Sequence, residues 1–574
     1  MKNQELSHLF SELATHLELQ EVPFKPQAFL RVAETLKTLG KDVEEIYQKE
    51  GLTGLEALPG VGKGIAGKME EYLKTGKIKE LTAYKKKMPV NIEELTLVEG
   101  IGPKMVKELW KYLKIKSLKD LEREAKAGKV AKLSGFGEKK EQNILEGIVF
   151  LKKSKGRQLL HEIYPIAQKY VEELKGSGLV SRAIPAGSLR RMKETIKDID
   201  ILVTTKQPEK VMDFFVHMIP HVKVWGKGKT KMSLRNKEGF DVDVRVVEEK
   251  VFGAALQYFT GSKEHNVKVR ALAQKKGFLL SEYGLFKGKK LLVCKTEEAI
   301  YKALGMEYIE PELREDQGEV EAALKGNLPN LIAYDALKGD LQVQTNWTDG
   351  KHSIEEMAKE AKKQGLQYIA ITDHTRDLAM VGGADEKKLL AQMVEIDRLQ
   401  KKISGIKILK GAEVNIRKDG SLDIVDKVLS KLDVVGASVH SYFKLSRKDM
   451  TERIIRAMEN PNVDILFHPT GKRLPLRQEY DIDMDKIIKT AKETGTILEA
   501  NASSRMDLSD INIKKAAYAG VKLVINSDAH DKSHFAFLKF GIAQARRGWV
   551  KGSDVVNTLS VDKFLSSLKK NHRT

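Results

Sequence analysis

The chain has 574 residues and carries 100 lysines and arginines against 80 aspartates and glutamates, a formal net charge of +20. This length predicts several domains, and this charge favours a polyanion such as nucleic acid as the partner. A single cysteine, no run of about 18 apolar residues and an N-terminus without an apolar signal core exclude an internal disulfide, a cysteine-based zinc site and a membrane span, so we expect a cytoplasmic protein with no membrane partner.

The first third of the chain is predicted to be helical, because apolar residues recur at helical spacing through residues 1–150. Three segments in it share a Gly-x-Gly turn followed by a helix start: residues 58–69, 98–109 and 133–144. A helix start offers free N–H groups to phosphate, so the pattern is that of helix-hairpin-helix motifs, which grip a DNA backbone without reading sequence. One copy also serves as a plain turn between helices, but three in a basic segment favour DNA. The expected DNA-binding residues are Gly60, Gly62, Lys63, Lys68, Gly100, Gly102, Gly135 and Gly137.

The next stretch, residues 187–203, reads GSLRRMKETIKDIDILV and ends in a predicted strand. Asp198 and Asp200 share one face of that strand because strand side chains alternate. In FDVDVRVV, residues 240–247, Asp243 shares a face of another strand with Asp241 and Arg245. Carboxylates on neighbouring strands beside a Gly-Ser turn and an arginine pair predict a two-metal site for phosphoryl transfer, with Mg²⁺ as a suitable ion.

Together with YFTGS at residues 258–262, these motifs resemble the family X DNA polymerases, the relatives of DNA polymerase beta. The resemblance implies that Asp198, Asp200 and Asp243 hold two Mg²⁺ or Mn²⁺ ions, with Asp243 nearest the primer 3′-hydroxyl. It also implies a set of nucleotide-binding residues: Gly187, Ser188, Arg191, Tyr258, Phe259, Gly261, Asn266 and Arg270. The chain departs from the family at Met192 and Lys197, where glycine is usual, which puts nucleotide affinity in doubt.

The same resemblance gives Lys68 the place of the Schiff-base lysine of a 5′-deoxyribose-phosphate lyase, with Arg31 and Lys63 near the 5′-phosphate of a gap. The alternative for Lys68 is a plain phosphate contact. The expected domains are a small gap-binding, lyase-like domain (1–85), a duplex-binding helix-hairpin-helix domain (86–154), a nucleotidyltransferase palm (155–250), a thumb (251–315), a linker (316–335) and a C-terminal domain (336–574).

The C-terminal domain is predicted to be a distorted (βα)7 barrel, so the whole chain is a multidomain α+β protein. Apolar runs, each followed by a helix-like segment, recur near residues 341–345, 368–371, 406–410, 433–439, 463–467, 496–498 and 521–525. Ligand-type residues follow most of these runs: Asp349, His374, Glu413, His440, His468, Asp528 and His530. Imidazole with carboxylate suits Zn²⁺ or Mn²⁺. The pattern resembles the PHP domain, a trinuclear phosphoesterase that supplies 3′-5′ exonuclease activity in some family X polymerases.

One departure concerns the first barrel strand. The PHP motif opens with His-x-His, and Gln342 and Gln344 stand there instead. By family assignment those two would share one metal with Glu413 and Asp528. The other two metals would use intact sets, one of Asp349, His374 and His530 and one of Glu413, His440 and His468. We therefore expect up to two well-held metals and a weakened or lost exonuclease.

The sequence thus predicts a monomeric DNA-dependent DNA polymerase that fills short gaps during base excision repair, acting on gapped or nicked double-stranded DNA and deoxynucleoside triphosphates. A template-independent nucleotidyltransferase is one alternative, and the template-side residues Asn266 and Arg270 speak against it. A DNA-binding scaffold with decayed active sites is a second, kept open by Met192, Lys197 and the two glutamines. A PHP phosphatase acting on a small molecule is a third, which the hairpin repeats disfavour.

Overall fold

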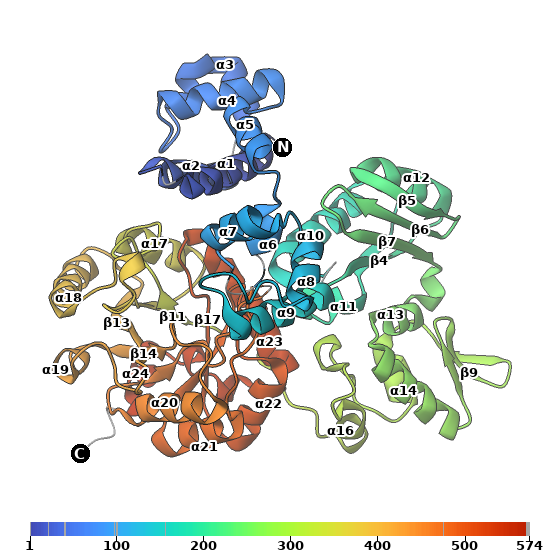
Figure 1. Cartoon of the computed structure of the whole chain (residues 1–574). Helices are drawn as coiled ribbons and strands as arrows, with labels where there is room; N and C mark the ends of the chain where they lie inside the picture. The colour runs from blue at the N-terminus through green and yellow to red at the C-terminus, as the bar shows by residue number, and fades with distance from the viewer. Residues whose placement is uncertain are drawn as a thin grey trace. The chain divides into compact units, whose positions relative to one another are not determined.

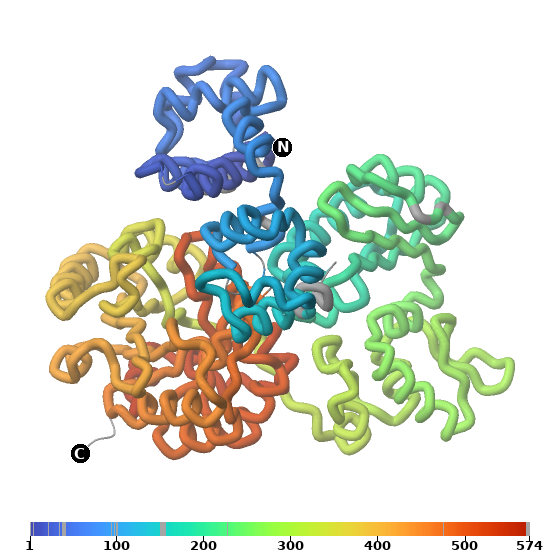
Figure 2. Tube along the Cα trace, in the orientation of Figure 1, coloured from blue at the N-terminus to red at the C-terminus, as the bar shows by residue number. Residues whose placement is uncertain are grey.

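The computed structural model describes residues 2–20, 22–39, 42–96, 98, 101–154, 157–474 and 476–569 (Figure 2). The chain divides into two compact units, residues 1–155 and 156–574. Gly100, one of the expected DNA-binding residues, lies outside the described residues. Across the described ranges, no helix combines the length and the apolar character needed to cross a bilayer.

The first unit is built of helices around two apolar cores. On the first helix Leu6, Phe10, Leu13 and Leu17 recur every three or four residues and are almost fully buried, as an amphipathic helix requires. Helices α1 to α5 enclose one core and α6 to α9 the other. Their bounds are α1 Lys2–Leu19, α2 Lys25–Thr38, α3 Val43–Glu56, α4 Lys63–Thr75, α5 Lys79–Lys87, α6 Ile92–Thr96, α7 Pro103–Leu113, α8 Leu118–Lys126 and α9 Gly137–Ser154.

The second unit begins with a five-stranded sheet in the order β2-β4-β7-β6-β5, in which β4 and β7 are parallel and the other pairs antiparallel. Helices α10 and α12 pack on it, and a two-stranded ladder of β1 and β3 lies beside it. This is the palm: β1 Gln158–Leu159, α10 Leu160–Gly176, β2 Arg182–Pro185, α11 Gly187–Arg190, β3 Thr195–Ile196, β4 Asp198–Thr204, α12 Pro208–Met218, β5 His221–Lys227, β6 Lys231–Asn236 and β7 Asp241–Val247.

The thumb follows, with a three-stranded antiparallel sheet in the order β10-β9-β8. Its elements are α13 Phe252–Thr260, α14 Lys263–Lys275, β8 Leu279–Ser281, β9 Gly284–Lys287, β10 Lys290–Val293 and α15 Glu297–Ala303. The segment expected as a linker contains a short helix, α16 Glu319–Lys325, whose Val320 and Ala323 join the apolar core of the thumb. Glu319 is buried there and bonds His265 of α14 at 2.7 Å.

The C-terminal part is a nearly closed barrel of seven parallel strands in chain order, as predicted (Figure 1). The strands are β11 Gly339–Val343, β12 Tyr368–Ile371, β13 Lys407–Asn415, β14 Val434–Ser438, β15 Ile465–Leu466, β16 Ile497–Asn501 and β17 Leu523–Asn526. Helices cover them: α17 Ile354–Lys363, α18 Glu386–Gln400, α19 Asp426–Leu429, α20 Arg447–Glu459, α21 Met484–Thr494, α22 Asp510–Ala519, α23 Leu538–Arg547 and α24 Val561–Ser567. Side chains of the strands divide between a core under the helices and a second core that includes Phe564 of α24.

Palm and barrel share one apolar cluster. Met506, Phe540 and Ala543 of the barrel pack with the apolar side chains of α10 and the palm sheet. The ring of Phe540 lies edge-on to Tyr164 of α10, with 5.7 Å between the ring centroids. A buried polar contact lies at the same interface, where Lys472 Nζ is 2.9 Å from Glu194 Oε1. The palm core is therefore completed by side chains from the barrel.

Candidate active sites

Three carboxylates gather on the two parallel strands of the palm. The register pairs Asp200 with Asp243 and Asp198 with Asp241, so the expected ligands lie on adjacent strands of one face. Burial, together with the charges of Asp198 and Asp243, raises the pKa of Asp200 to about 7. Lys231 and Arg245 act in the opposite direction, and Lys231 Nζ lies 3.5 Å from Asp243 Oδ2. Carboxylates that repel one another in a half-buried site fit hard divalent cations.

Gly187 lies directly against this group. Its φ is 58°, in the left-handed region, and a Cβ atom added to it would lie 2.3 Å from Asp200 Oδ2. Only glycine fits there without moving the carboxylate. This contact links the Gly-Ser turn to the acidic face.

Gly187→Ala is therefore expected to lower the rate of nucleotide addition by about 100-fold, because the carboxylate of Asp200 must shift. Gly178→Ala is the matched control, since Gly178 has a φ of 68° but open space around it. Both variants carry the same backbone strain of about 1–3 kcal/mol, visible in thermal unfolding. Equal loss of activity in the two variants would contradict the proposed contact.

The raised pKa of Asp200 predicts a pH-dependent affinity for Mg²⁺. Below pH 7 the metal-free carboxyl is mostly protonated, and a cation must displace that proton. Affinity should fall about 10-fold per pH unit below 7 and level off above it. Calorimetric titration at pH 6, in two buffers of different ionisation enthalpy, should show about one proton released per chain. The same titration of the Asp200→Asn chain measures the protons exchanged by other groups. Equal affinity for Mg²⁺ at pH 6 and pH 8 would refute the prediction.

The two arginines after the turn already have partners. Arg190 forms two bonds to Glu297, of 2.9 and 2.6 Å, deep in the thumb. Arg191, an expected triphosphate ligand, donates to Glu315 Oε1 at 2.9 Å, and the barrel residue Arg547 donates to the same oxygen at 3.1 Å. Burial tends to raise the pKa of Glu315, but Arg547 and Arg191 lower it below its usual value. For the expected contact with triphosphate, Arg191 would have to exchange Glu315 for phosphate.

Met192 and Lys197, the two departures from the family pattern, differ in burial. Met192 is buried and has a φ of 53°, a conformation that glycine adopts without cost, which gives a physical reason for the usual residue. Lys197 is exposed, next to Asp198, and adds positive charge beside the acidic face. Neither side chain blocks the contact between Gly187 and Asp200.

The expected nucleotide-binding residues of the thumb lie on α13, α14 and the turn between them. The half-buried rings of Tyr258 and Phe259 lie edge-on, with 5.1 Å between their centroids. Asn266 is buried, and its Nδ2 donates to Tyr258 O at 2.7 Å. Arg270 lies over the ring of Tyr258, 6.0 Å from its centroid. Gly261, at a φ of 68°, would bring an added Cβ to 3.1 Å from a guanidinium nitrogen of Arg191.

In the first unit, the Gly-x-Gly turns precede helix starts. Gly62 precedes α4 and Gly102 precedes α7, and neither helix has a side-chain cap, so their first N–H groups are available to phosphate. Gly135 and Gly137 both have positive φ at the start of α9, at 81° and 69°. Lys63 and Arg31 are exposed, whereas Lys68 forms an ion pair with Glu80 of α5.

The histidines and carboxylates expected as barrel ligands converge at the carboxyl ends of the strands. Among the described residues, two groups are close enough to hold a metal ion: Asp349 with His374 and His530, and His374 with Glu413 and His440. His468 joins the second group, because its Nε2 lies 2.8 Å from Glu413 Oε1. His374 Nδ1 is buried and has no hydrogen-bond partner among the described residues. His374 Nδ1 lies 3.5 Å from Glu413 Oε2, and a buried imidazole nitrogen beside a carboxylate fits a metal ligand.

The pKa values of these groups are shifted in different directions by burial and by their charged neighbours. Burial tends to raise the pKa of Glu413, but His374, His440 and His468 hold it well below its usual value. Burial lowers the pKa of His468 to about 4, so its imidazole is neutral. Burial would also lower the pKa of His530, yet Asp349 and Asp528 raise it to about 9. In the metal-free site His468 is therefore neutral, whereas His530 is an imidazolium that must lose its proton before it can bind a metal ion.

The position opposite Gln342 and Gln344 does not fit a zinc ion. Both glutamines are fully buried, and their Nε2 atoms donate to the same oxygen, Glu413 Oε2, at 3.1 and 2.8 Å. Arg505 Nε lies 3.2 Å from Asp528 Oδ2, and Asn501 donates to that oxygen at 3.3 Å. Amide and guanidinium N–H groups thus take up the carboxylate oxygens that a metal would need.

The sequence interpretation missed Asn501 and Arg505. Asn501 ends the sixth barrel strand, the one for which no ligand was named, and Arg505 follows it in the polar run NASSR. Glu315 and Arg547 were also missed, because they are far from Arg191 in the sequence. The polar run directly after a buried strand was the available signal for the first pair.

Comparisons with known proteins cover the whole chain. Family models match in four places: a helix-hairpin-helix domain over residues 1–78, a SAM-like helix-hairpin-helix tandem over 92–148, a DNA polymerase beta thumb over 255–315 and a PHP domain over 340–503. A protein of Bacillus subtilis (strain 168), named DNA polymerase/3′-5′ exonuclease PolX, is 35% identical over 100% of both chains.

Other relatives match the barrel region. A probable phosphatase of Thermoanaerobacter sp. (strain X514) is 37% identical over 38% of this chain and 89% of its own length. A probable phosphatase of Acetivibrio thermocellus is 34% identical over 31% of this chain and 73% of its own. The barrel region thus matches most of the length of these two relatives.

Proposed function

The chain belongs to the family X DNA polymerases that carry a C-terminal PHP domain and is a DNA-directed DNA polymerase; on this premise we propose that it fills short gaps in DNA during repair. The observation that carries the proposal is the acidic face of the palm, where Asp200 and Asp243 pair in register and Gly187 closes on Asp200. Tandem helix-hairpin-helix motifs support a gapped duplex as the substrate. The polymerase acts as a monomer in this proposal.

In the proposed reaction, Asp198, Asp200 and Asp243 would hold two Mg²⁺ or Mn²⁺ ions, with Asp243 on the side of the primer 3′-hydroxyl. When bound, the ions lower the pKa of that hydroxyl and offset the charge on the leaving pyrophosphate. Arg191 releases Glu315 and takes up the triphosphate together with the Gly187-Ser188 turn. Tyr258, Phe259 and Gly261 lie along the sugar, while Asn266 and Arg270 check the shape of the new pair from the minor groove.

The proposed grip on DNA uses the helix starts of the first unit. The uncapped N-termini of α4 and α7, with Gly60, Gly62, Lys63 and Gly102, offer N–H groups and positive charge to backbone phosphates. The start of α9, with Gly135 and Gly137, does the same on the duplex side. Such contacts hold DNA regardless of its sequence.

The barrel is proposed to keep a weak 3′-5′ exonuclease. Asp349, His374 and His530 would hold one Zn²⁺ or Mn²⁺ ion, and Glu413, His440 and His468 a second. The glutamine pair, which donates into Glu413, leaves no place for a third. The loss of that ion is the proposed reason for weak hydrolysis.

Lyase chemistry at Lys68 is limited by its ion pair with Glu80, which stabilises the ammonium form that cannot attack an aldehyde. If Lys68 is the nucleophile, Glu80→Gln should raise the borohydride-trapped adduct on 5′-deoxyribose-phosphate DNA about threefold. Lys68→Ala should remove the adduct. The matched control is Lys74→Ala on the same helix, which pairs with Glu70 at 2.8 Å. An adduct that survives Lys68→Ala would assign the reaction to another amine.

Gap filling is tested with a labelled primer on duplexes that carry a one-nucleotide gap, with and without a 5′-phosphate. The proposal expects addition of one templated nucleotide, faster on the phosphorylated gap. Addition without a template strand would favour a template-independent enzyme. Tight binding of gapped DNA with no addition would favour a scaffold.

A further inference from the structure

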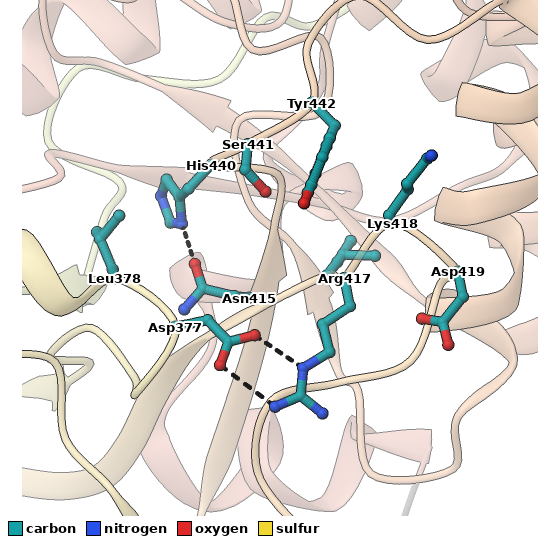
Figure 3. Close-up of a pocket in the computed structure, with 10 residues that line it drawn as sticks. Asp377, Leu378, Asn415, Arg417, Lys418, Asp419, His440, Ser441 and Tyr442 are labelled. Carbon is teal, nitrogen blue, oxygen red and sulfur yellow. Dashed lines mark hydrogen bonds and ion pairs between the residues drawn. The ribbon is translucent and has the colours of Figure 1, made fainter.

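A cleft of about 360 Å³ opens beside the candidate metal centre of the barrel (Figure 3). One wall is the end of β13 with the turn after it, residues 415–419. The other wall is the loop after β14, residues 440–442, and Asp377 and Leu378 form the remaining side. His440, a member of the metal group, lines the cleft. A ligand in this cleft would therefore reach the metal centre at one end.

One buried arginine fixes both walls of the cleft. Arg453 of α20 is 2% exposed, and its guanidinium donates to Arg417 O at 2.8 Å and to Ser441 O at 2.8 Å. It also donates to Ile416 O. An ion pair joins the first wall to the remaining side of the cleft, where Arg417 Nε lies 2.7 Å from Asp377 Oδ2. The cleft is thus preorganised rather than a gap between loose loops.

The groups that face the cleft suit a nucleotide. Tyr442 is 60% exposed and has a φ of 55°, a conformation that costs a non-glycine residue about 1–3 kcal/mol. Figure 3 shows its ring reaching into the space between His440 and Lys418. Lys418 Nζ lies 5.9 Å from the centroid of that ring. An exposed aromatic ring stacks on a base, and a lysine beside it pairs with phosphate.

We propose that this cleft binds the 3′-terminal nucleotide of a DNA strand, with the base stacked on Tyr442 and its phosphate directed to the metal centre past His440. Lys418 contacts the neighbouring phosphate, and Leu378 lines the side opposite. The inference rests on the proposed function of the barrel at DNA 3′ ends. It concerns binding, which does not require the third metal or rapid hydrolysis.

Base stacking is measured with a single-stranded oligonucleotide that carries 2-aminopurine at its 3′ end. The Asp198→Ala/Asp200→Ala chain serves as the parent, in Mn²⁺, so that the palm takes no part. Fluorescence should be quenched on binding, and Tyr442→Ala should weaken the quenched complex about 10-fold or more. Tyr442→Phe should keep the quench because it keeps the ring. Tyr518→Ala is the matched control, an exposed tyrosine on α22 of the same barrel.

An equal quench in Tyr442→Ala and the parent would overturn the proposal. Tyr442-dependent quenching of 2-aminopurine placed five nucleotides from the 3′ end would overturn the assignment to the terminal nucleotide. Equally tight binding of free 2-aminopurine deoxynucleoside monophosphate would show a small-molecule site and overturn the assignment to a strand. Gap filling by the unmodified chain is measured separately, so its absence would refute the proposed polymerase role without affecting the Tyr442 result.

Discussion

Asp243→Ala is expected to reduce templated nucleotide addition by about 1000-fold, because it removes a carboxylate proposed to hold the charge-stabilising cations at the primer end. The side chain lies on β7 in register with Asp200, and Lys231 is its nearest cation at 3.5 Å. The loss should appear in kcat, measured by single-turnover addition on a one-nucleotide gap with saturating nucleotide. Affinity for gapped DNA should change little, since the proposed DNA-binding contacts lie in the first unit.

Asp241→Asn is the matched control for that experiment. Asp241 lies two residues away on the same face of β7, but its carboxylate pairs with Arg235 at 2.9 and 3.0 Å. The Asp241→Asn chain should add nucleotides at a rate within a few-fold of that of the unmodified chain. Comparable losses in the two variants would mean that negative charge on this face matters in general, and that Asp243 is not a specific ligand.

Gln342→His/Gln344→His is expected to raise Mn²⁺-dependent shortening of a primer 3′ end by about 10- to 100-fold. The physical reason is that each glutamine now donates an N–H to Glu413 Oε2, whereas a neutral imidazole offers a lone pair and frees that oxygen for a metal. Elemental analysis of the purified chain should find about one additional metal ion.

Gln364→His controls for the added imidazole, because Gln364 is exposed at the C-terminal end of α17 and is not one of the expected metal ligands. An extra bound metal without faster shortening would show that the glutamines do not limit the nuclease. No extra metal would show that Arg505 and Asn501, which bond Asp528, still occupy the position.

Local patterns predicted much of the fold. All seven apolar runs became barrel strands in chain order, because buried parallel strands need continuous apolar sequence. The segment at 316–335 was expected as a linker on account of its glycine and acidic residues, but it contains α16. Glu319 looks like a surface residue in the sequence, and its burial depends on His265, which lies 54 residues earlier. A distant partner of that kind leaves no local signal.

The candidate sites were predictable where spacing fixes geometry. Asp198 and Asp200 share a face because a strand alternates, and their neighbour Asp243 follows from the pairing of two acidic strands. The partners of Arg191 were not predictable, since Glu315 and Arg547 reach it from the thumb and the barrel. The hydrogen bonds from Gln342 and Gln344 to Glu413 were not predictable either. Glutamine at the two histidine positions does not by itself reveal which carboxylate its amide contacts.

Because palm and barrel share an apolar cluster, loss of the barrel would destabilise the palm whether or not the barrel hydrolyses DNA. Phe540 and Met506 each contribute about 1.5–3 kcal/mol by burial against the palm, so a gene shortened to lose the barrel would encode a polymerase with an uncovered core. Selection on DNA synthesis would then retain the barrel even while its metal ligands drift. Point inactivation rather than truncation is the appropriate way to separate the two activities, and Gln342 and Gln344 are the kind of change that such drift permits.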